Sequence, residues 1–178
     1  YIRKGGIHIF TQETTIHNIT LPDYLKKLDW IIFDIETTGF DRSKTKVILV
    51  GLIFQKKEEI IVKQIFAESL NDEKLLLSEL LNDFANKEIY ISFNGNQFDI
   101  PYLNARYFSN EIYFKLTKIK SFDIYPYFKD NRSLFKLPNA KLKTIEKYFD
   151  IRDRQYPAFG RWRGYPGHRE TSGPVHIC

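Results

Sequence analysis

Two carboxylates with one residue between them are the first feature of the sequence that could do chemistry. Asp34 and Glu36 lie in the segment FDIETTG, residues 33–39, at the end of an apolar run. Residues two apart on a strand point to the same face, about 6.5–7 Å apart. Such a pair beside a core is costly unless a positive charge lies between the carboxylates, and paired oxygen ligands suit Mg²⁺ or Mn²⁺. The simpler alternative is that both acids cap the following loop, but the Thr-Thr-Gly turn favours the metal site.

A third acid, Asp99, follows another strand candidate in the segment ISFNGNQFDIP, residues 91–101. An Asp just before a helical Pro is by itself often a plain helix N-cap. In a chain that already has a strand-end pair, a second strand-end acid favours the interpretation that Asp99 joins the same site. Two divalent ions about 3.5–4 Å apart can hold the attacking and the leaving oxygen of a phosphoryl displacement. This is the chemistry that we expect of the three acids.

The elements that must position these acids follow from the hydrophobic pattern. We expect strands over residues 30–35, 46–54, 59–66 and 88–93. We expect helices from a cap at Asn71 or Asp72 to about residue 85, from Pro101 to about residue 108, after Pro126, and over the apolar positions Leu142, Ile145 and Phe149. Strands that first form an antiparallel meander and then alternate with helices predict an α/β fold with a mixed sheet.

The length of 178 residues fits one domain with a sizeable core. We expect an irregular N-terminal lead-in over residues 1–28, the domain over residues 29–150, and an atypical, poorly ordered tail over residues 151–178. The tail has no Lys, whereas the preceding 150 residues have 18, and it has neither helical nor strand periodicity. Translation out of frame after about Arg154 and a genuine but unrelated end both stay open as explanations.

Composition excludes several classes of protein. No apolar run approaches the roughly 20 residues that a bilayer-spanning helix needs, and the start of the chain has no secretory signal pattern. The single cysteine, Cys178, excludes an internal disulfide and a cysteine-based metal cluster. We therefore expect a cytoplasmic protein without a membrane partner.

Charge is unevenly distributed along the chain. Residues 1–114 hold 13 Lys and Arg against 16 Asp and Glu, whereas residues 115–147 hold 9 against 3. A basic stretch downstream of an acidic one suits a nucleic-acid backbone that lies across a carboxylate site. A solvated helical face with lysines for solubility explains the charge pattern about equally well.

Five sequence blocks, in this order, resemble the DEDD or DnaQ-like 3′–5′ exonucleases of the RNase H-like superfamily, and more closely the bacterial YprB-type predicted exonucleases. The blocks are FDIETTG, VILVGLIF, FNGNQFDIPYL, FDIYP and LPNAKLKTIEKYF, and they extend from about residue 30 to about residue 151. The resemblance implies an RNase H-like α/β fold, in which an antiparallel meander and parallel strands form one mixed sheet flanked by helices. It also implies metal-dependent hydrolysis of nucleic-acid phosphodiesters from a 3′ end.

Carried over residue by residue, the resemblance implies that Asp34, Glu36 and Asp99 are catalytic metal ligands. The first two match the family's first motif and Asp99 matches its second. The complete family site holds two Mg²⁺ or Mn²⁺ ions, and Glu36 also orients the attacking water. The expected partner is nucleic acid, either single-stranded or at a 3′ end.

Four further residues are expected around these ligands. Thr37, Thr38 and Asn94 are expected to contact the substrate strand. Asp123 matches a recurrent Asp of the family, and we interpret it as a residue behind the metal ligands or as a cap for the helix at Pro126.

The sequence departs from the family pattern after residue 151. The family completes its site with a downstream Asp that follows a His or Tyr, which activates the water. His168 and His176 have no Asp after them, and Asp153 comes too early. We therefore expect three of the four site acids, no general base, and a chain that is nearly inactive alone.

Two other functions stay open. The first is an RNase H-like module that binds nucleic acid without cutting it. The second is a small-molecule phosphohydrolase, which would not need the separate basic stretch. The sequence does not discriminate DNA from RNA as the substrate, and it gives no oligomeric state.

Overall fold

The computed structural model of the protein describes residues 2–4, 7–17, 19–117 and 120–151. The chain divides into two compact units, the first ending at Tyr127 and the second beginning at Phe128. All of the predicted site residues lie in the first unit. The tail beyond residue 151 lies outside the described residues, and its expected poor order stays a prediction.

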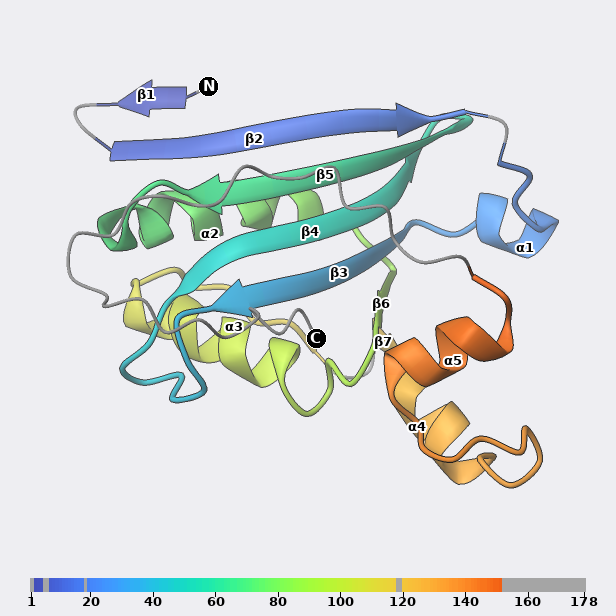
Figure 1. Ribbon diagram of the computed structural model, residues 1–178. Helices are drawn as coiled ribbons and strands as arrows, with labels where there is room; N and C mark the ends of the chain where they lie inside the picture. The colour runs from blue at the N-terminus through green and yellow to red at the C-terminus, as the bar shows by residue number, and fades with distance from the viewer. Residues whose placement is uncertain (1, 5–6, 18, 118–119, 152–178) are drawn as a thin grey trace. The chain divides into compact units, whose positions relative to one another are not determined.

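One mixed sheet of seven strands forms the described part of the first unit, in the order β1-β2-β5-β4-β3-β6-β7 (Figure 1). The strands are β1 (Ile2–Lys4), β2 (Ile7–Ile16), β3 (Trp30–Thr37), β4 (Val47–Lys56), β5 (Glu59–Ala67), β6 (Ile89–Ser92) and β7 (Ser121–Asp123). Neighbours from β1 to β3 are antiparallel, whereas β3, β6 and β7 are parallel. The predicted α/β fold with a mixed sheet is confirmed.

The β3–β4–β5 meander follows from alternation along each strand. On β3, Phe33 and Ile35 are buried while Asp34 and Glu36 are only partly buried, because successive side chains point to opposite faces of a sheet. The β4–β5 turn is tight, and Lys57 takes a φ of 57° there. Two-residue hairpin turns favour such positive φ values because their twist matches that of the strands.

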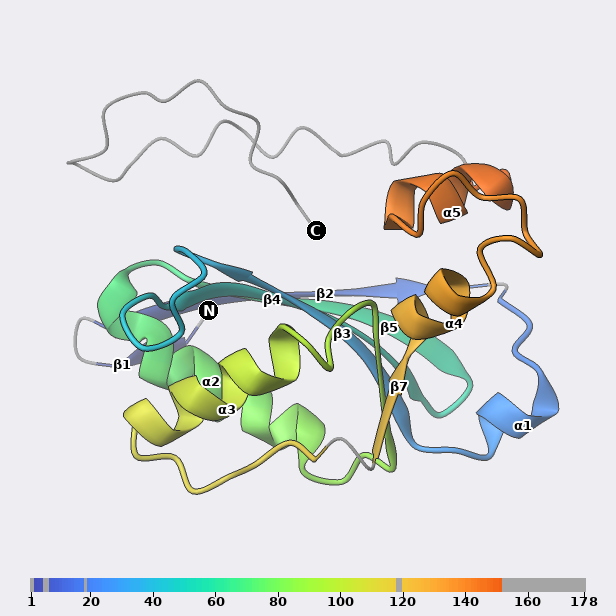
Figure 2. The same cartoon turned by 90° about the horizontal axis from the view of Figure 1, so that it is seen from below.

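Two helices cover one face of this sheet. They are α2 (Glu73–Phe84) and α3 (Asp99–Ser109), which lie on the same side in Figure 2. The core that they form with the strands includes Phe33, Ile35, Val50, Leu52, Leu76, Leu77, Leu80, Phe84, Ile100, Leu103 and Tyr107. Removing these apolar side chains from water stabilises the fold by about 25 cal/mol for each Å² buried.

Asp72, one of the two expected cap residues, is the N-cap residue of α2, but its side chain makes no cap hydrogen bond to this helix. A short 3-10 helix, η1 (Leu70–Asp72), precedes α2, and its cap is Ser69, which forms a capping box with Asp72. The Asp72 carboxylate also accepts a hydrogen bond from His8 N at 3.1 Å. Asp99 is the first residue of α3 rather than its N-cap, and no side chain caps this helix.

The expectation of an irregular lead-in over residues 1–28 is wrong. β1 and β2 belong to the sheet, and β2 pairs with β5 from Ile9 opposite Ala67 to Ile16 opposite Ile60. A short helix, α1 (Asp23–Lys26), follows. The β2 sequence is rich in Thr and other polar residues, so it lacks a strong apolar pattern. Strand formation there depends on a partner about fifty residues away, since β-propensity is set largely by context.

The second unit has a small aromatic core of its own. α4 (Ile124–Asp130) leads into it and α5 (Leu142–Tyr148) ends its described part. Phe128 packs against Phe135 and Phe149, with ring centroids 5.4 and 5.9 Å apart, and Ile145 of α5 is buried. The two short helices predicted here are present. No described helix is long and apolar enough to cross a membrane.

A buried ion pair clamps α2 to α3 beneath the β3–β4 loop. Arg106 Nε and Nη2 lie 2.8 and 2.7 Å from the two carboxylate oxygens of Glu73, which also accepts hydrogen bonds from Val47 N and Asn110 Nδ2. Burial opposes ionisation of Glu73, but these hydrogen bonds outweigh it and hold its pKa below the usual value. Arg106 Nη1 also donates to Arg42 O in the loop, at 3.2 Å.

We expect Arg106→Leu to lower the free energy of unfolding by about 3–5 kcal/mol, because it leaves the Glu73 carboxylate buried without its partner. Urea unfolding measures the loss. Lys74→Leu is the control, since it breaks the exposed Lys74–Glu111 pair and should change stability by less than about 1 kcal/mol. Equal losses in both variants would contradict a special role for the buried pair.

Candidate functional site

Asp34 and Glu36 leave β3 side by side on the face opposite the helices. Both are partly buried. Glu36 Oε1 is shielded from solvent and has no hydrogen-bond partner among the described residues. Burial first, and then the neighbouring charge of Asp34, raises the pKa of Glu36 from 4.5 to about 7. A nearby positive charge would lower this pKa and stabilise the ionised carboxylate.

Asp99 reaches the same strand from the start of α3. β6 pairs with β3 only as far as Ile32, so the Ile35 N–H on that edge has no strand partner. Asp99 Oδ1 accepts this N–H at 3.2 Å. Asp99 is only 4% exposed, and burial, followed by the charge of Asp34, raises its pKa from 3.8 to about 7. Asp34 therefore lies within electrostatic reach of both Glu36 and Asp99, and the joint role of the three acids in one metal site stays a prediction.

Asp123 ties the loop after β6 to β7. Its Oδ1 accepts hydrogen bonds from Asn94 N at 2.7 Å and Tyr125 N at 3.1 Å, and its Oδ2 accepts one from Asn96 N at 3.0 Å. Asn94 takes a φ of 65°, which Asn tolerates better than most residues. The Asp123 carboxylate therefore holds the loop, and its charge adds to the rise in the pKa of Asp99.

Gly95 lies where a side chain would not fit. A Cβ at this position would overlap Ser92 Oγ, and it would lie 2.5 Å from Ser92 Cβ and 3.4 Å from Asp99 Oδ2. The loop therefore packs directly against the acid. Ser92 Oγ and Asn96 Oδ1, on either side of Gly95, are both buried without a hydrogen-bond partner among the described residues.

The Thr-Thr-Gly turn after β3 is organised around one carbonyl. Gly39 O accepts hydrogen bonds from Thr37 Oγ1 at 2.9 Å, Thr45 Oγ1 at 3.0 Å and Tyr102 OH at 3.1 Å. Thr38 Oγ1 accepts one from the N–H of residue 46 at 3.0 Å. Both threonine hydroxyls thus shape the turn, and their contact with substrate stays a prediction, as does that of Asn94.

Tyr102 is a residue that the sequence analysis missed. It lies on α3 and is buried, while its hydroxyl reaches across to the turn after β3. The only signal was its place in the FNGNQFDIPYL block, where a core tyrosine and a hydrogen-bonding one look alike. Phe40, in the same turn, is 87% exposed, with its ring centroid 6.1 Å from that of Phe98.

The donor chemistry of the site fits a hard divalent cation, but the side chains do not yet form a cage. Among the described residues, no group of three or more His, Cys, Asp or Glu could hold an ion as the side chains stand. Asp99 Oδ1 accepts the Ile35 N–H, and its second oxygen has acceptor capacity left for an ion. Glu36 has an oxygen without a hydrogen-bond partner in the described part of the chain, and Glu36 and Asp99 both have a pKa of about 7. A bound divalent cation would coordinate that oxygen and lower both pKa values.

A family model of the RNase_H superfamily matches residues 31–164. This is more than half of the chain, and the protein belongs to this superfamily. The match continues past residue 151, where the resemblance in sequence was expected to end. His168 and His176 lie beyond it, and these residues and Asp153 lie outside the described residues. No curated protein matches the chain.

Solved structures of two kinds share the fold. The family B DNA polymerase of the archaeon Pyrobaculum calidifontis is 17% identical, with a TM-score of 0.56 over 71% of this chain and 19% of its own. An exonuclease I structure is 11% identical, with a TM-score of 0.57 over 71% of this chain and 36% of its own. Escherichia coli exonuclease I with a dT13 oligonucleotide is also 11% identical, with a TM-score of 0.55 over 68% and 36%. The chain thus spans 19–36% of these proteins, and at such identities the likeness shows the fold alone.

We expect Gly95→Ala to lower the free energy of unfolding by roughly 1–3 kcal/mol, because the added methyl group overpacks the loop against Ser92. Ser92→Gly removes both atoms that the methyl group meets first. The cost of Gly95→Ala should therefore be smaller in the Ser92→Gly background, and a double-mutant cycle measures the difference. Gly51→Ala is the control, since a Cβ there meets nothing within 4 Å. Additive losses at residues 92 and 95 would contradict the direct contact.

Without metal, the three acids should make stability fall as pH rises. The folded pKa values of Glu36 and Asp99, about 7, exceed the ordinary 4.5 and 3.8. The folded protein therefore holds these protons more tightly, and the free energy of unfolding decreases from about pH 4 through about pH 7. Asp34→Asn should reduce this fall. In chelator at about pH 8, we expect Asp34→Asn to melt at a higher temperature than the parent, with a free energy of unfolding larger by on the order of 1 kcal/mol after solvent screening. At about pH 4 the two proteins should have the same melting temperature.

The matched control for this measurement is Glu58→Gln, which removes one exposed acid on the β4–β5 turn and should leave the pH profile unchanged. A lower melting temperature for Asp34→Asn at about pH 8 would make Asp34 a structural residue instead.

Proposed function

We propose that this protein is a metal-dependent nuclease that hydrolyses phosphodiester bonds of nucleic acid, acting as a 3′–5′ exonuclease. The observation that carries the proposal is the convergence of three acids from two separate segments, Asp34 and Glu36 from β3 and Asp99 from α3, linked by the Asp99–Ile35 hydrogen bond. Membership of the RNase_H superfamily supports the same conclusion. So do the neighbours of this fold, which include exonuclease I bound to single-stranded DNA.

In this proposal Asp34, Glu36 and Asp99 hold Mg²⁺ or Mn²⁺, which supplies charge stabilisation for the displaced oxygen. Asp123 acts as a positioning residue, because it fixes the loop that packs on Asp99. Phe40 offers an exposed ring beside the site, and bases of a single strand stack on such rings.

One observation favours a second candidate, a nucleic-acid-binding domain that does not cut. The described side chains form no ready metal cage, and the downstream acid and base that the resemblance implies were not found in the sequence. Metal binding separates the two candidates, because only the enzyme needs an ion at the three acids.

We expect Mn²⁺ to raise the melting temperature of the parent, because an ion bound only by the folded state stabilises it by about 2.7 kcal/mol at 100 times its Kd. Asp34→Asn and Asp99→Asn should remove most of this shift and should abolish Mn²⁺-dependent shortening of a 5′-labelled single strand. Glu58→Gln is the control and should behave like the parent. If Mn²⁺ does not stabilise the parent, the proposal of a metal-dependent nuclease is contradicted, and the nucleic-acid-binding domain is the remaining candidate.

A further inference from the structure

The second unit carries a charge of opposite sign to the first. Residues 128–151 hold six Lys and Arg against three Asp and Glu, a balance of +3, whereas residues 1–127 hold 16 against 17, a balance of −1. The site acids lie in the unit with the negative balance. A polyanion is therefore attracted by the second unit rather than by the unit that carries the carboxylates.

All six cations of the second unit are exposed: Lys129, Arg132, Lys136, Lys141, Lys143 and Lys147. Lys141, Lys143 and Lys147 form no ion pair with another described residue. Two acids, Glu146 and Asp150, lie near them in sequence and reduce the local charge without cancelling it.

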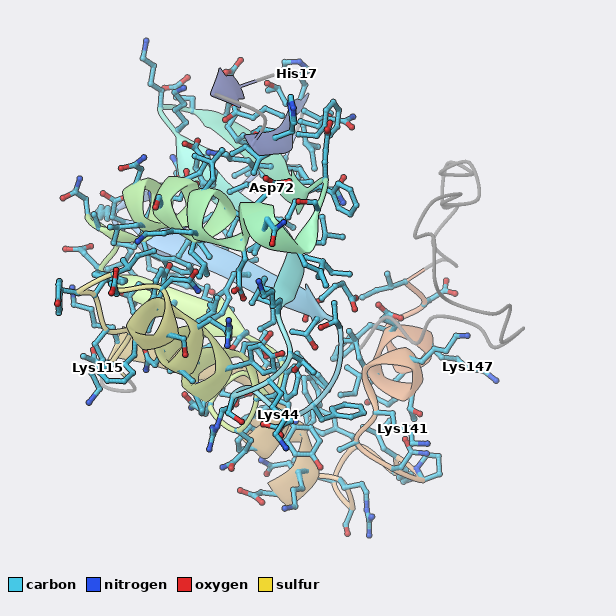
Figure 3. The ribbon with its side chains drawn as sticks, turned by 90° about the vertical axis from the view of Figure 1, so that its left-hand side faces the viewer. His17, Lys44, Asp72, Lys115, Lys141 and Lys147 are labelled. Carbon is cyan, nitrogen blue, oxygen red and sulfur yellow. The ribbon has the colours of Figure 1, made fainter. Side chains whose placement is uncertain are left out.

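The helix places two of these lysines on one side. Ile145 of α5 is buried, and Lys143 and Lys147, one helical turn apart, lie on the side of the helix away from it, whereas Lys141 is the N-cap residue. Asn139 Oδ1 accepts hydrogen bonds from Lys141 N at 3.0 Å and Thr144 Oγ1 at 2.7 Å, and so it sets the start of the helix. Figure 3 labels Lys141 at this start and Lys147 near the other end.

Two aromatic residues follow Lys147 in the sequence. Tyr148 and Phe149 are about half exposed, their ring centroids lie 5.0 Å apart, and their other contacts are with Phe135 and Phe128 of the aromatic core. Cations next to partly exposed rings are the combination with which proteins hold single strands without sequence preference, since cations contact phosphates and rings stack on bases. An acidic protein segment would use the cations but not the rings.

We propose that the exposed lysines of α5 and of its N-cap residue, Lys141, Lys143 and Lys147, form a docking surface for the phosphodiester backbone of single-stranded nucleic acid. None of them belongs to the carboxylate site. The inference rests on the proposed function, because the strand that the lysines bind is the one that the carboxylates would cut. The lysines give this strand a second contact, which is purely electrostatic. Neutralised phosphates release their counterions, so binding here weakens as salt is raised.

The test measures anisotropy of a fluorescent oligothymidylate in chelator, so that hydrolysis plays no part. For single strands the slope of log K against log salt changes by about 0.7 for each phosphate that the protein no longer neutralises. The variant Lys141→Gln/Lys143→Gln/Lys147→Gln should therefore flatten the slope by about 2 between about 50 and 200 mM salt. The control Lys27→Gln/Lys56→Gln/Lys57→Gln removes the same charge from exposed positions of the first unit and should keep the parent slope.

Two further variants secure the interpretation. Replacing the three α5 lysines by Arg keeps the charge and should keep the slope, whereas a flatter slope in this variant too would mean that α5 is merely damaged and would overturn the surface. Equal flattening in the Lys27/Lys56/Lys57 control would also overturn it, because net charge alone would then explain binding. Competition by polyglutamate as strong as that by unlabelled oligonucleotide would point to an acidic protein partner instead.

The proposed function fails independently of this surface. The variant Lys141→Gln/Lys143→Gln/Lys147→Gln should keep the rise in melting temperature that Mn²⁺ gives the parent, while it flattens the salt dependence of binding in chelator. If the parent binds through the α5 lysines but gains no stability from Mn²⁺, the proposed docking surface is supported and the proposed enzyme is contradicted.

Discussion

The Ile35 N–H is the point on which the site depends. β6 stops pairing with β3 at Ile32, and an amide left without a partner beside the core costs free energy comparable to that of a missing hydrogen bond. The Asp99 carboxylate takes the place of the missing strand. α3 begins at Asp99, and the loop that precedes it packs on the acid. The hydrogen bond to Ile35 therefore gives a structural reason for the position of Asp99 against the strand of Asp34 and Glu36.

Gathering acids in this way opposes folding, and the surrounding contacts offset it. Burial and mutual repulsion raise the pKa of both Glu36 and Asp99, whereas the hydrogen bonds around them hold their segments in place. Asp123 fixes the loop after β6 through two backbone amides, those of Asn94 and Asn96, and Tyr102 fixes the turn after β3 through Gly39 O. A local cost at one site with compensating contacts around it is typical of a region kept for function.

The strands β3 to β6 could be predicted because each depends on local pattern. The apolar run before Asp34 and the spacing of two acids are visible in a few neighbouring residues, whereas the role of these acids stays a prediction. β2 could not be predicted, since its polar, Thr-rich sequence becomes a strand only beside β5. Asp123 was expected behind the ligands or as a helix cap, and it does accept a hydrogen bond from Tyr125 N at the start of α4. Its bonds to Asn94 N and Asn96 N, and those of the Tyr102 hydroxyl to Gly39 O and Thr45 Oγ1, join segments far apart in the sequence, so no local pattern reveals them.

Charge segregation gives the two units different physical tasks. A cluster of carboxylates that waits for a cation repels a phosphate chain, so the first unit is poorly suited to capture its own substrate. Cations placed among the carboxylates would help capture, but they would also compete with a divalent ion for the same oxygens. Lysines outside the carboxylate site avoid that competition. The sequence carries a charge balance of +3 over residues 128–151 and of −1 over residues 1–127, and screened surface charges act over about 8–10 Å at moderate salt.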